Sequence, residues 1–445
     1  MALSWRAAAL AAVGVIPLVF IPTHALAWGW LFLVLVVCAL DLYLALSPRL
    51  LRVEREVTET LRADEHTESI VTITNPTKRG IRLHIRDAWP PSTHPTPAHH
   101  HALLPGGDTV RVVTTLTPQR RGTRAADRVT LRVWGPLGVA ARQISLVAPL
   151  KISVLPEFRA RRLLPSRLAR LHELEGSTAT VLRGPGTEFD SLREYVRGDD
   201  PRDIDWRASA RTPELVVRTW RPERDRHVVI VLDAGRSGAL LLGAPRDVAE
   251  DANALDLGAA PRIDAGIEAA LLLGALADRA GDQVHFLAID REVRARVSGI
   301  RGPGLLQQCA SSLVDVSASL QPIDWKLVVA EVGRTVRHAA CVVLLTELPP
   351  AGTDPELSEA VQILLRSHTV IVASAQDPTV TALAQGRDGS GDVFSAASAA
   401  SVLRETAHGA QDLRRQGAVV ADVDAGRLAA RLSDLYIELK KAGRL

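Results

Sequence analysis

The chain has 445 residues, 47% hydrophobic and 23% charged, which is the composition of a globular protein large enough for several domains. The net charge of +3 is small and the basic residues are interleaved with acids, so we expect no nucleic-acid partner. Cys38, Cys309 and Cys341 are far apart, which excludes a disulfide framework and a cysteine metal site and suits a reducing compartment.

Two apolar runs open the chain, at residues 7–21 and 25–46, separated by Pro22-Thr23-His24. Each is near the ~20 residues that cross a bilayer, so residues 1–47 are predicted to form a transmembrane helical hairpin. The alternative is that the first run is a signal peptide, because Arg6 precedes it and Ala25-Leu26-Ala27 resembles a cleavage site.

Both alternatives give the same topology. Arg49, Arg52 and Arg55 follow the second run, and the positive-inside rule puts this end in the cytoplasm. We therefore expect soluble domains on the cytoplasmic side of the inner or plasma membrane. Asp41 lies near the end of the second run, where snorkelling to the interface is the expected behaviour, with a helix-pairing or functional role as the alternative.

Residues 48–156 have a β pattern. Short alternating segments are separated by turn signals such as Asn75-Pro76 and Gly135-Pro136-Leu137-Gly138; the segments are 69–74, 81–86, 109–116, 128–133 and 144–147. Regular short strands with Gly/Pro turns predict a small immunoglobulin-like β-sandwich. His99, His100 and His101 lie near prolines with no accompanying acid or cysteine, so an exposed loop without a metal is expected.

Residues 157–225 contain an unusual charged segment. Acids and arginines alternate in it beside aromatic residues, with Asp199, Asp200, Asp203 and Asp205 among Arg193, Arg197, Arg202, Arg207 and Arg211. Residues 188–196 have apolar side chains at helical spacing and predict a short helix that Gly198 ends. The acids and arginines are interpreted as a structural salt-bridge and capping network, or alternatively as a catalytic or partner-binding site.

Residues 226–445 alternate between continuous apolar strands and helices, which predicts a mostly parallel sheet covered on both faces. Asp233, Asp290 and Glu347 fall at the carboxyl ends of predicted strands, where such sheets carry their functional crevice. The glycine-rich residues 376–398 are expected to form a flexible excursion.

These residues resemble the bacterial family called domain of unknown function 58. The matching positions include Gly186, Glu188, Phe189, Leu192, Arg193, Tyr195, Gly198, Asp199, Asp200, Arg202, Ile204, Asp205, Trp206, Ser209, Ala210, Arg211 and 231–233. The resemblance extends to Arg120-Arg121-Gly122, to residues 135–138 and to the C-terminal residues 440–445. It implies a von Willebrand factor A-like, Rossmann-type α/β domain behind a membrane hairpin and a β domain, with a MoxR-type AAA+ ATPase as partner.

The von Willebrand A fold often holds Mg²⁺ at an Asp-x-Ser-x-Ser element, and here the corresponding residues are Asp233-Ala234-Gly235-Arg236-Ser237. Gly235 replaces a hydroxyl ligand and Arg236 adds a positive charge, while Thr346-Glu347 stands where aspartate is usual. We therefore expect no cofactor, with Mg²⁺ on Asp233 and Ser237 as the alternative. In the metal-free case, Arg236 is expected to take the cation's place and pair with Asp233 or Glu347.

The chain has no P-loop and no GxSxG, HExxH or CxxC motif, so we expect a non-enzymatic protein. The leading hypothesis is a membrane-tethered, cytoplasm-facing binding or scaffold module that serves a MoxR-type ATPase in the assembly or maturation of protein complexes. The alternatives are a carboxylate-dependent hydrolase that uses the acids of residues 199–205, and a purely structural cell-envelope protein.

Overall fold

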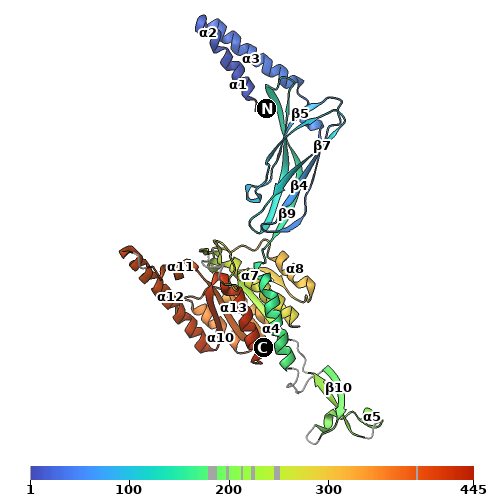
Figure 1. Ribbon diagram of the computed structural model, residues 1–445, viewed down its shortest axis with the longest axis vertical. Coiled ribbons are helices and arrows are strands. Elements are labelled where there is room, and N and C mark those ends of the chain that lie inside the picture. The colour runs from blue at the N-terminus through green and yellow to red at the C-terminus, as the bar shows by residue number, and fades with distance from the viewer. Residues whose placement is uncertain are drawn as a thin grey trace. The chain divides into compact units, whose positions relative to one another are not determined.

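The computed structural model describes residues 2–178, 188–196, 200–211, 214–221, 226–244, 251–386 and 389–445. The chain divides into two compact units, Met1–Glu157 and Phe158–Leu445 (Figure 1). The first unit contains the apolar N-terminal helices and a β domain, and the second contains an α/β domain.

The N-terminal helices are α1 (Trp5–Val13), α2 (Val15–Phe20) and α3 (His24–Leu44), and α1 and α2 lie beside α3 (Figure 1). Trp30 fixes this arrangement: its indole N–H donates to the Leu10 carbonyl at 3.1 Å, and its ring covers Gly14 so closely that no Cβ fits there. By length and composition, one helix of the described chain, α3, is long and apolar enough to cross a membrane.

The β domain consists of two sheets. One has the order β1-β9-β8-β5-β6 with β3 on β9, and the other has the order β2-β4-β7. The strands are β1 (Ala2–Leu3), β2 (Arg52–Glu56), β3 (Thr60–Arg62), β4 (Thr67–Thr74), β5 (Ile81–Asp87), β6 (His99–Leu104), β7 (Thr109–Leu116), β8 (Gly122–Trp134) and β9 (Ala140–Leu155). The five predicted strands correspond to β4, β5, β7, β8 and β9. Alternate residues point inward, and the core between the sheets includes Val71, Ile73, Leu83, Ile85 and Leu131.

The histidine cluster is not in a loop, as the sequence had suggested, but in strand β6. His100 Nε2 lies 2.9 Å from the Thr114 hydroxyl, and His101 pairs with His84 across the ladder. The prolines that favoured a loop, Pro95 and Pro97, lie before the strand begins. In the part of the chain that the structure describes, no three His, Cys, Asp or Glu residues are grouped to hold a metal.

Asp41 does not snorkel. It is fully buried, and its carboxylate accepts hydrogen bonds from the backbone N–H groups of Leu137 (2.8 Å), Val139 (2.7 Å) and Ala140 (2.8 Å). Leu137 and Val139 lie in the turn between β8 and β9, and Ala140 begins β9, so the acid near the end of α3 binds the helix to the β domain. The physical reason is that three fixed N–H donors compensate the carboxylate for its loss of water.

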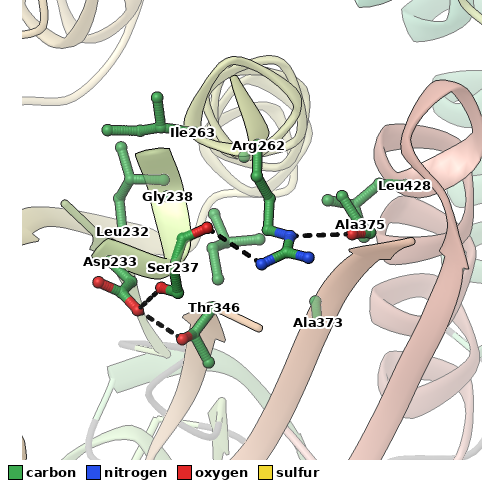
Figure 2. Close-up of a pocket in the computed structure, with 12 residues that line it drawn as sticks. Leu232, Asp233, Ser237, Gly238, Arg262, Ile263, Thr346, Ala373, Ala375 and Leu428 are labelled. Atoms are coloured by element: carbon green, nitrogen blue, oxygen red, sulfur yellow. Dashed lines mark hydrogen bonds between the residues drawn. The ribbon is translucent and has the colours of Figure 1, made fainter. Parts of the chain in front are cut away.

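The second unit is built on a six-stranded sheet with the order β16-β15-β12-β17-β18-β19. Its strands are β12 (His227–Asp233), β15 (Gln283–Ile289), β16 (Val293–Val297), β17 (Ala340–Leu345), β18 (Thr369–Gln376) and β19 (Val419–Asp424). All neighbours are parallel except β15 and β16, an antiparallel edge pair that was not predicted. The carboxyl ends of β12 and β17 therefore meet at one edge, close to Arg262, the first residue of helix α7 (Arg262–Arg279) (Figure 2).

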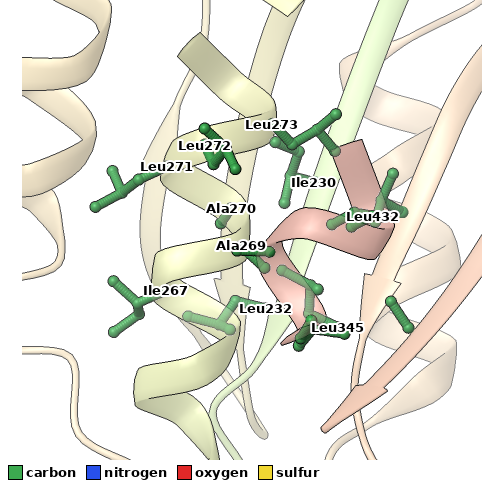
Figure 3. Packing of buried hydrophobic residues seen from close by; sticks show 14 of the residues in the cluster. Ile230, Leu232, Ile267, Ala269, Ala270, Leu271, Leu272, Leu273, Leu345 and Leu432 are labelled. Carbon is green, nitrogen blue, oxygen red and sulfur yellow. The ribbon is translucent and has the colours of Figure 1, made fainter. Parts of the chain in front are cut away.

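Helices cover both faces of this sheet, because β12 is apolar on both sides. Val228, Ile230 and Leu232 pack with α7 (Arg262–Arg279), α13 (Leu428–Lys441) and α4 (Leu164–Thr178). Figure 3 shows Ile230 and Leu232 beside α7 and Leu432 of α13. Val229 and Val231 pack on the opposite face with α9 (Trp325–Thr335), α10 (Pro355–Leu365) and part of α12 (Ser390–Gln416). Helix α8 (Pro303–Ser312) packs against α7.

Two local predictions in this unit are wrong. The segment from Glu188 to Glu194 is a strand, β10, because pairing with β11 (Val216–Arg221) satisfies its backbone and overrides the helical spacing of its apolar residues. Residues 376–398 are not one flexible excursion: they contain α11 (Pro378–Leu383) and the start of α12. Gly389 is the N-cap of α12 and Gly391 lies in its first turn, so both glycines mark a helix start.

Candidate functional site

Asp233, the last residue of β12, is the centre of a small polar cluster at the carboxyl edge of the sheet (Figure 2). Its Oδ1 accepts from the Gly235 N–H at 2.7 Å, and its Oδ2 accepts from the hydroxyls of Thr346 (2.6 Å) and Ser237. Thr346 follows β17, so the parallel pairing of β12 and β17 brings it beside Asp233. Of the residues predicted to share this crevice, Gly235, Ser237 and Thr346 are therefore in contact with Asp233.

The carboxylate of Asp233 is sealed from solvent. The residue is 4% exposed, and burial raises its pKa although the hydrogen bonds from Ser237, Thr346 and Gly235 act in the opposite direction. Glu347 adds a smaller effect that also raises this pKa. A buried acid with satisfied oxygens is poorly placed to exchange protons with a substrate.

Arg262, and not Arg236, is the cation of the crevice. Its guanidinium forms an ion pair with Glu347 at 3.0 Å and donates to the carbonyls of Ser237 (3.0 Å) and Ala375 (3.1 Å). The Arg236 side chain is exposed, and its backbone N–H donates to the Gln321 carbonyl at 2.8 Å. The expectation that Arg236 pairs with Asp233 or Glu347 is therefore wrong, because Arg236 begins the short helix α6 (Arg236–Ala239) and points its side chain outward.

The donor set fits Mg²⁺ poorly. Asp233 is its one unpaired carboxylate, since Glu347 is engaged by Arg262, and only the hydroxyls of Ser237 and Thr346 accompany it. At Gly235, an added Cβ would lie 2.9 Å from the Gln321 carbonyl oxygen and from the Ile323 nitrogen. The neighbouring segment thus occupies the space that a hydroxyl-bearing ligand at this position would need.

The cavity beside these residues has a volume of about 10 Å³ and is lined by Leu232, Asp233, Ser237, Arg262, Thr346 and Ala375 among others (Figure 2). This space is about that of one water molecule. It is too small for an organic substrate.

Asp290, another acid predicted at a strand end, lies after β15, and its carboxylate is bound by Arg294 and not by the Asp233 cluster. Burial acts to raise its pKa, but the hydrogen bond from Arg294 and the N–H of Glu292 outweigh it, so the pKa is lowered. Asp290 is thus held by its own hairpin and by the Asp324 N–H, which donates to its carbonyl. Its carboxylate makes no direct contact with Asp233 among the described residues.

The segment with the unusual charges folds as a β-hairpin, β10 with β11, that carries the short helix α5 (Trp206–Ser209). Asp205 joins these parts. Its Oδ1 accepts from the N–H groups of Arg207 and Ala208 at 3.0 Å, and its Oδ2 binds Arg218 of β11 at 2.9 Å. The hydrogen bond from Ala208 and then that from Arg218 lower the pKa of Asp205. Asp205 is therefore a helix cap and ion-pair partner.

Other residues of the predicted salt-bridge and capping network also stabilise this hairpin. The Ser209 hydroxyl accepts from the Val216 N–H at 2.9 Å, the Tyr195 N–H donates to the Leu215 carbonyl, and Asp200 accepts from the Arg202 N–H. Arg193 donates to the Glu194 carbonyl, and Arg202 and Arg211 are exposed. Gly186, Gly198 and Asp199 lie outside the described residues, as do the side chains of Glu188 and Phe189.

A family model described as "Protein of unknown function DUF58" matches residues 191–416, about half of the chain. The chain belongs to the DUF58 family. The match begins within β10 and ends at the last residue of α12, so it includes both the hairpin and the Asp233 crevice. No curated protein matches the chain.

Solved structures match a segment of this DUF58 protein. One is the CARDB domain of a Pyrococcus furiosus protein in complex with di-metal ions, at 17% identity and a TM-score of 0.17, covering 24% of this chain and 87% of that chain. Another is the cupredoxin domain of amoB from Nitrosocaldus yellowstonii, at 14% identity and a TM-score of 0.18, covering 24% and 89%. A third is the PKD domain of an M14-like peptidase from a Thermoplasmatales archaeon, at 14% identity and a TM-score of 0.15, covering 23% and 92%.

Two residues of the site were missed from sequence. Arg262 is the first residue of an ordinary amphipathic helix, and Arg218 lies within a predicted strand. Neither has a local motif; Arg262 reaches its partners because α7 begins beside the carboxyl edge.

Proposed function

We propose that this DUF58 protein is a membrane-tethered, cytoplasm-facing protein-binding module with a von Willebrand A-like α/β domain, and that it is not an enzyme. One observation carries the proposal: at the carboxyl edge of the sheet the acid is sealed, while the surrounding surface is apolar and exposed. This combination suits contact with another protein better than chemistry on a small substrate.

The carboxyl-edge surface consists of Arg236, Leu240, Leu241, Leu320 and Glu347. Leu240 is 47% exposed, Leu241 is 59% exposed and Leu320 is 85% exposed. The segment that carries Leu320 is held against the Asp233 turn by two backbone hydrogen bonds, Ser319 N–H to Ala234 O and Arg236 N–H to Gln321 O. A group of exposed apolar side chains beside an arginine suits a protein-docking site.

The signature hairpin offers a second contact surface. Trp206 is 67% exposed and Val196 is 62% exposed, and Leu192 and Leu215 are also exposed. No residue of this hairpin belongs to a hydrophobic core cluster in the described chain. Exposed tryptophan is a frequent source of binding energy in interfaces.

Two of the acids in the hydrolase alternative are engaged within the hairpin. Asp205 caps α5 and pairs with Arg218, and Asp200 accepts from a backbone N–H, so both have structural partners. The Asp233 cavity has space only for water. We propose that the crevice works without a metal, with the Arg262 guanidinium as its resident cation.

The partner proposed from the family resemblance is a MoxR-type AAA+ ATPase. The tether in this proposal is the apolar N-terminal hairpin, in which α3 has the length and composition to cross a bilayer. The module would hold the ATPase at the membrane during the assembly or maturation of protein complexes.

Site-specific photo-crosslinking in cells tests the proposal. A photoreactive amino acid at Arg236 is expected to capture the ATPase, and Leu241→Asp in the same chain is expected to reduce capture at least tenfold, since a buried charge without a partner is costly at an interface. The matched control is a photoreactive residue at Arg366, exposed after α10. Equal capture from both positions, or capture that ignores Leu241→Asp, would contradict docking at the carboxyl edge.

A further inference from the structure

The first unit has a second, larger cavity, where α3 meets the β domain. Its volume is about 430 Å³. Its walls come from the end of α3, from the start of β5, from the end of β6 and from the β8–β9 turn; the residues that matter here are Leu44, Arg79, Arg82, Leu103, Trp134 and Pro136. The cavity is thus large enough for a phosphate-bearing headgroup, whereas the Asp233 cavity is not.

The lining includes two arginines and no acid. Arg82 is held by the turn, where its guanidinium donates to the carbonyls of Gly135 (3.2 Å) and Pro136 (2.6 Å). Arg79 is exposed at the start of β5, and neither arginine has an ion-pair partner among the described residues. Two uncompensated guanidinium groups on one cavity attract an anion.

A third arginine strengthens this charge. Arg6 of α1 donates to the Leu137 carbonyl at 3.3 Å, on the same turn. A Cβ placed on Gly138 would lie 3.0 Å from the Arg6 guanidinium and 3.5 Å from that of Arg82, so the two cations converge. Asp41, the acid of this turn, does not pair with them, because both its oxygens accept backbone N–H groups.

The apolar part of the lining indicates the source of the anion. Leu44 is the last residue of the apolar helix α3, and Leu103 is 75% exposed beside it in the lining. Trp134 lines the same cavity, and its buried indole N–H has no acceptor among the described residues. Basic groups, exposed leucine and tryptophan at the end of a membrane-length helix are what a lipid headgroup meets at the bilayer interface.

We infer that this cavity binds the phosphate headgroup of an anionic phospholipid, with Arg79, Arg82 and Arg6 as the cationic contacts and Leu44 and Leu103 beside the acyl chains. The inference rests on the membrane placement proposed for α3 and is independent of the ATPase. It assigns the β domain a role in recognising anionic lipids at the membrane surface.

Native mass spectrometry of the full-length chain, released from bilayers of phosphatidylglycerol and phosphatidylcholine, tests the inference. The wild type is expected to retain phosphatidylglycerol in preference to phosphatidylcholine. The double variant Arg79→Gln/Arg82→Gln is expected to bind phosphatidylglycerol about thirtyfold more weakly, given the contribution of each basic residue near an anionic bilayer. The matched control, Arg111→Gln/Lys151→Gln, removes two exposed charges outside the cavity and is expected to change binding less than twofold.

If the double variant fails to fold, the single variant Arg79→Gln tests the inference, because the Arg79 side chain makes no hydrogen bond among the described residues and only its backbone does. About fivefold weaker binding of phosphatidylglycerol is then expected. Equal retention of both lipids, or equal losses in the cavity and control variants, would overturn the inference. Displacement of phosphatidylglycerol by millimolar inorganic phosphate would also overturn it, by showing a site for free anions. A chain that leaves the membrane in cell fractionation would refute the tether instead, which is a separate result.

Discussion

Asp41 and Asp233 are buried aspartates at the ends of apolar elements, one in each unit, and each accepts three hydrogen bonds. Their donors differ. Asp41 faces three backbone N–H groups, which can only donate, whereas Asp233 faces one N–H and two hydroxyls, which can turn and accept. Asp41 must therefore remain a hydrogen-bond acceptor, whereas Asp233 can be replaced by a residue that also donates.

The largest expected effect follows from Asp41→Asn. The amide would set an N–H₂ group against backbone N–H donors and leave at least one of them unsatisfied in a buried site. We expect the free energy of unfolding of the first unit to fall by at least about 3 kcal/mol. Hydrogen exchange at Leu137, Val139 and Ala140 measures this directly, with Asp127→Asn, an exposed acid on β8, as the control. If the protection of these three amides from hydrogen exchange were unchanged, Asp41 would tolerate the amide as Asp233 does, and the predicted difference between the two aspartates would be wrong.

A glycine lies beside each aspartate, which sharpens the comparison. At Gly135, an added Cβ would collide with both the carboxylate and the backbone oxygen of Asp41. Gly135→Ala is therefore expected to cost about 2–3 kcal/mol by overpacking, measured by denaturant unfolding of the full-length chain in detergent. A stable Gly135→Ala protein with normal exchange at Leu137 would show that the turn can move away from Asp41.

Gly235→Ala is expected to be milder. Here the added Cβ would lie 2.9 Å from the Gln321 carbonyl oxygen and 3.0 Å from Asp233 Oδ1, so the segment 319–323 must shift by a few tenths of an ångström. We expect a loss of about 1–2 kcal/mol. The same unfolding experiment, read from the buried Trp325 of the second unit, gives the value; a loss larger than that of Gly135→Ala would reverse the ranking.

Asp233→Asn is expected to have the smallest effect, within about 1 kcal/mol at neutral pH, because Ser237 and Thr346 can accept from the new amide. The raised pKa of Asp233 gives the sign of the pH effect. The folded chain binds this proton more tightly than the unfolded chain, so ionisation costs the wild type stability as pH rises from about 4.

The Asp233→Asn variant has no carboxyl group to ionise at this position, so it does not lose this stability as the pH rises. Its stability relative to the wild type is therefore expected to increase from pH 4 to pH 7, as measured by urea unfolding at several pH values. Thr346→Val is the companion test, since it removes one donor to the carboxylate and should enlarge the benefit of Asp233→Asn. A relative stability that falls over this pH range would mean that the hydrogen bonds to Asp233 outweigh its burial and lower its pKa in the fold.

The sequence predicted those elements whose patterns are long and unambiguous. Continuous apolar runs identified β12 and β17, and alternation with Gly/Pro turns identified β4 and β7. Its failures were local ambiguities: residues 188–194 have a spacing compatible with helix or strand, and the glycines before α12 were taken for a loop. The secondary structure is determined by strand pairing in the first case and by the helix cap in the second. Neither can be recognised from a short stretch of sequence.

The candidate site was predicted in part. Asp233, Ser237 and Thr346 meet because strand ends in a parallel sheet meet, which is a rule of topology. Arg262 and the role of Asp41 were not predictable, since their partners are remote in sequence: Glu347 for the arginine, and residues 137–140 for the acid. A residue type at an element end suggests a contact, but only the fold determines which distant segment supplies it.

The short strand β1 has a consequence for how the molecule is made. Ala2 pairs with Ala141 and Leu3 pairs with Ala140, and the Ser4 hydroxyl donates to the Gly138 carbonyl. The beginning of the chain is thus completed by residues that leave the ribosome only after both apolar runs and most of the β domain. Strand β1 therefore has no pairing partner until β9 has been synthesised, so the first unit contains a strand pair whose two members are remote in sequence.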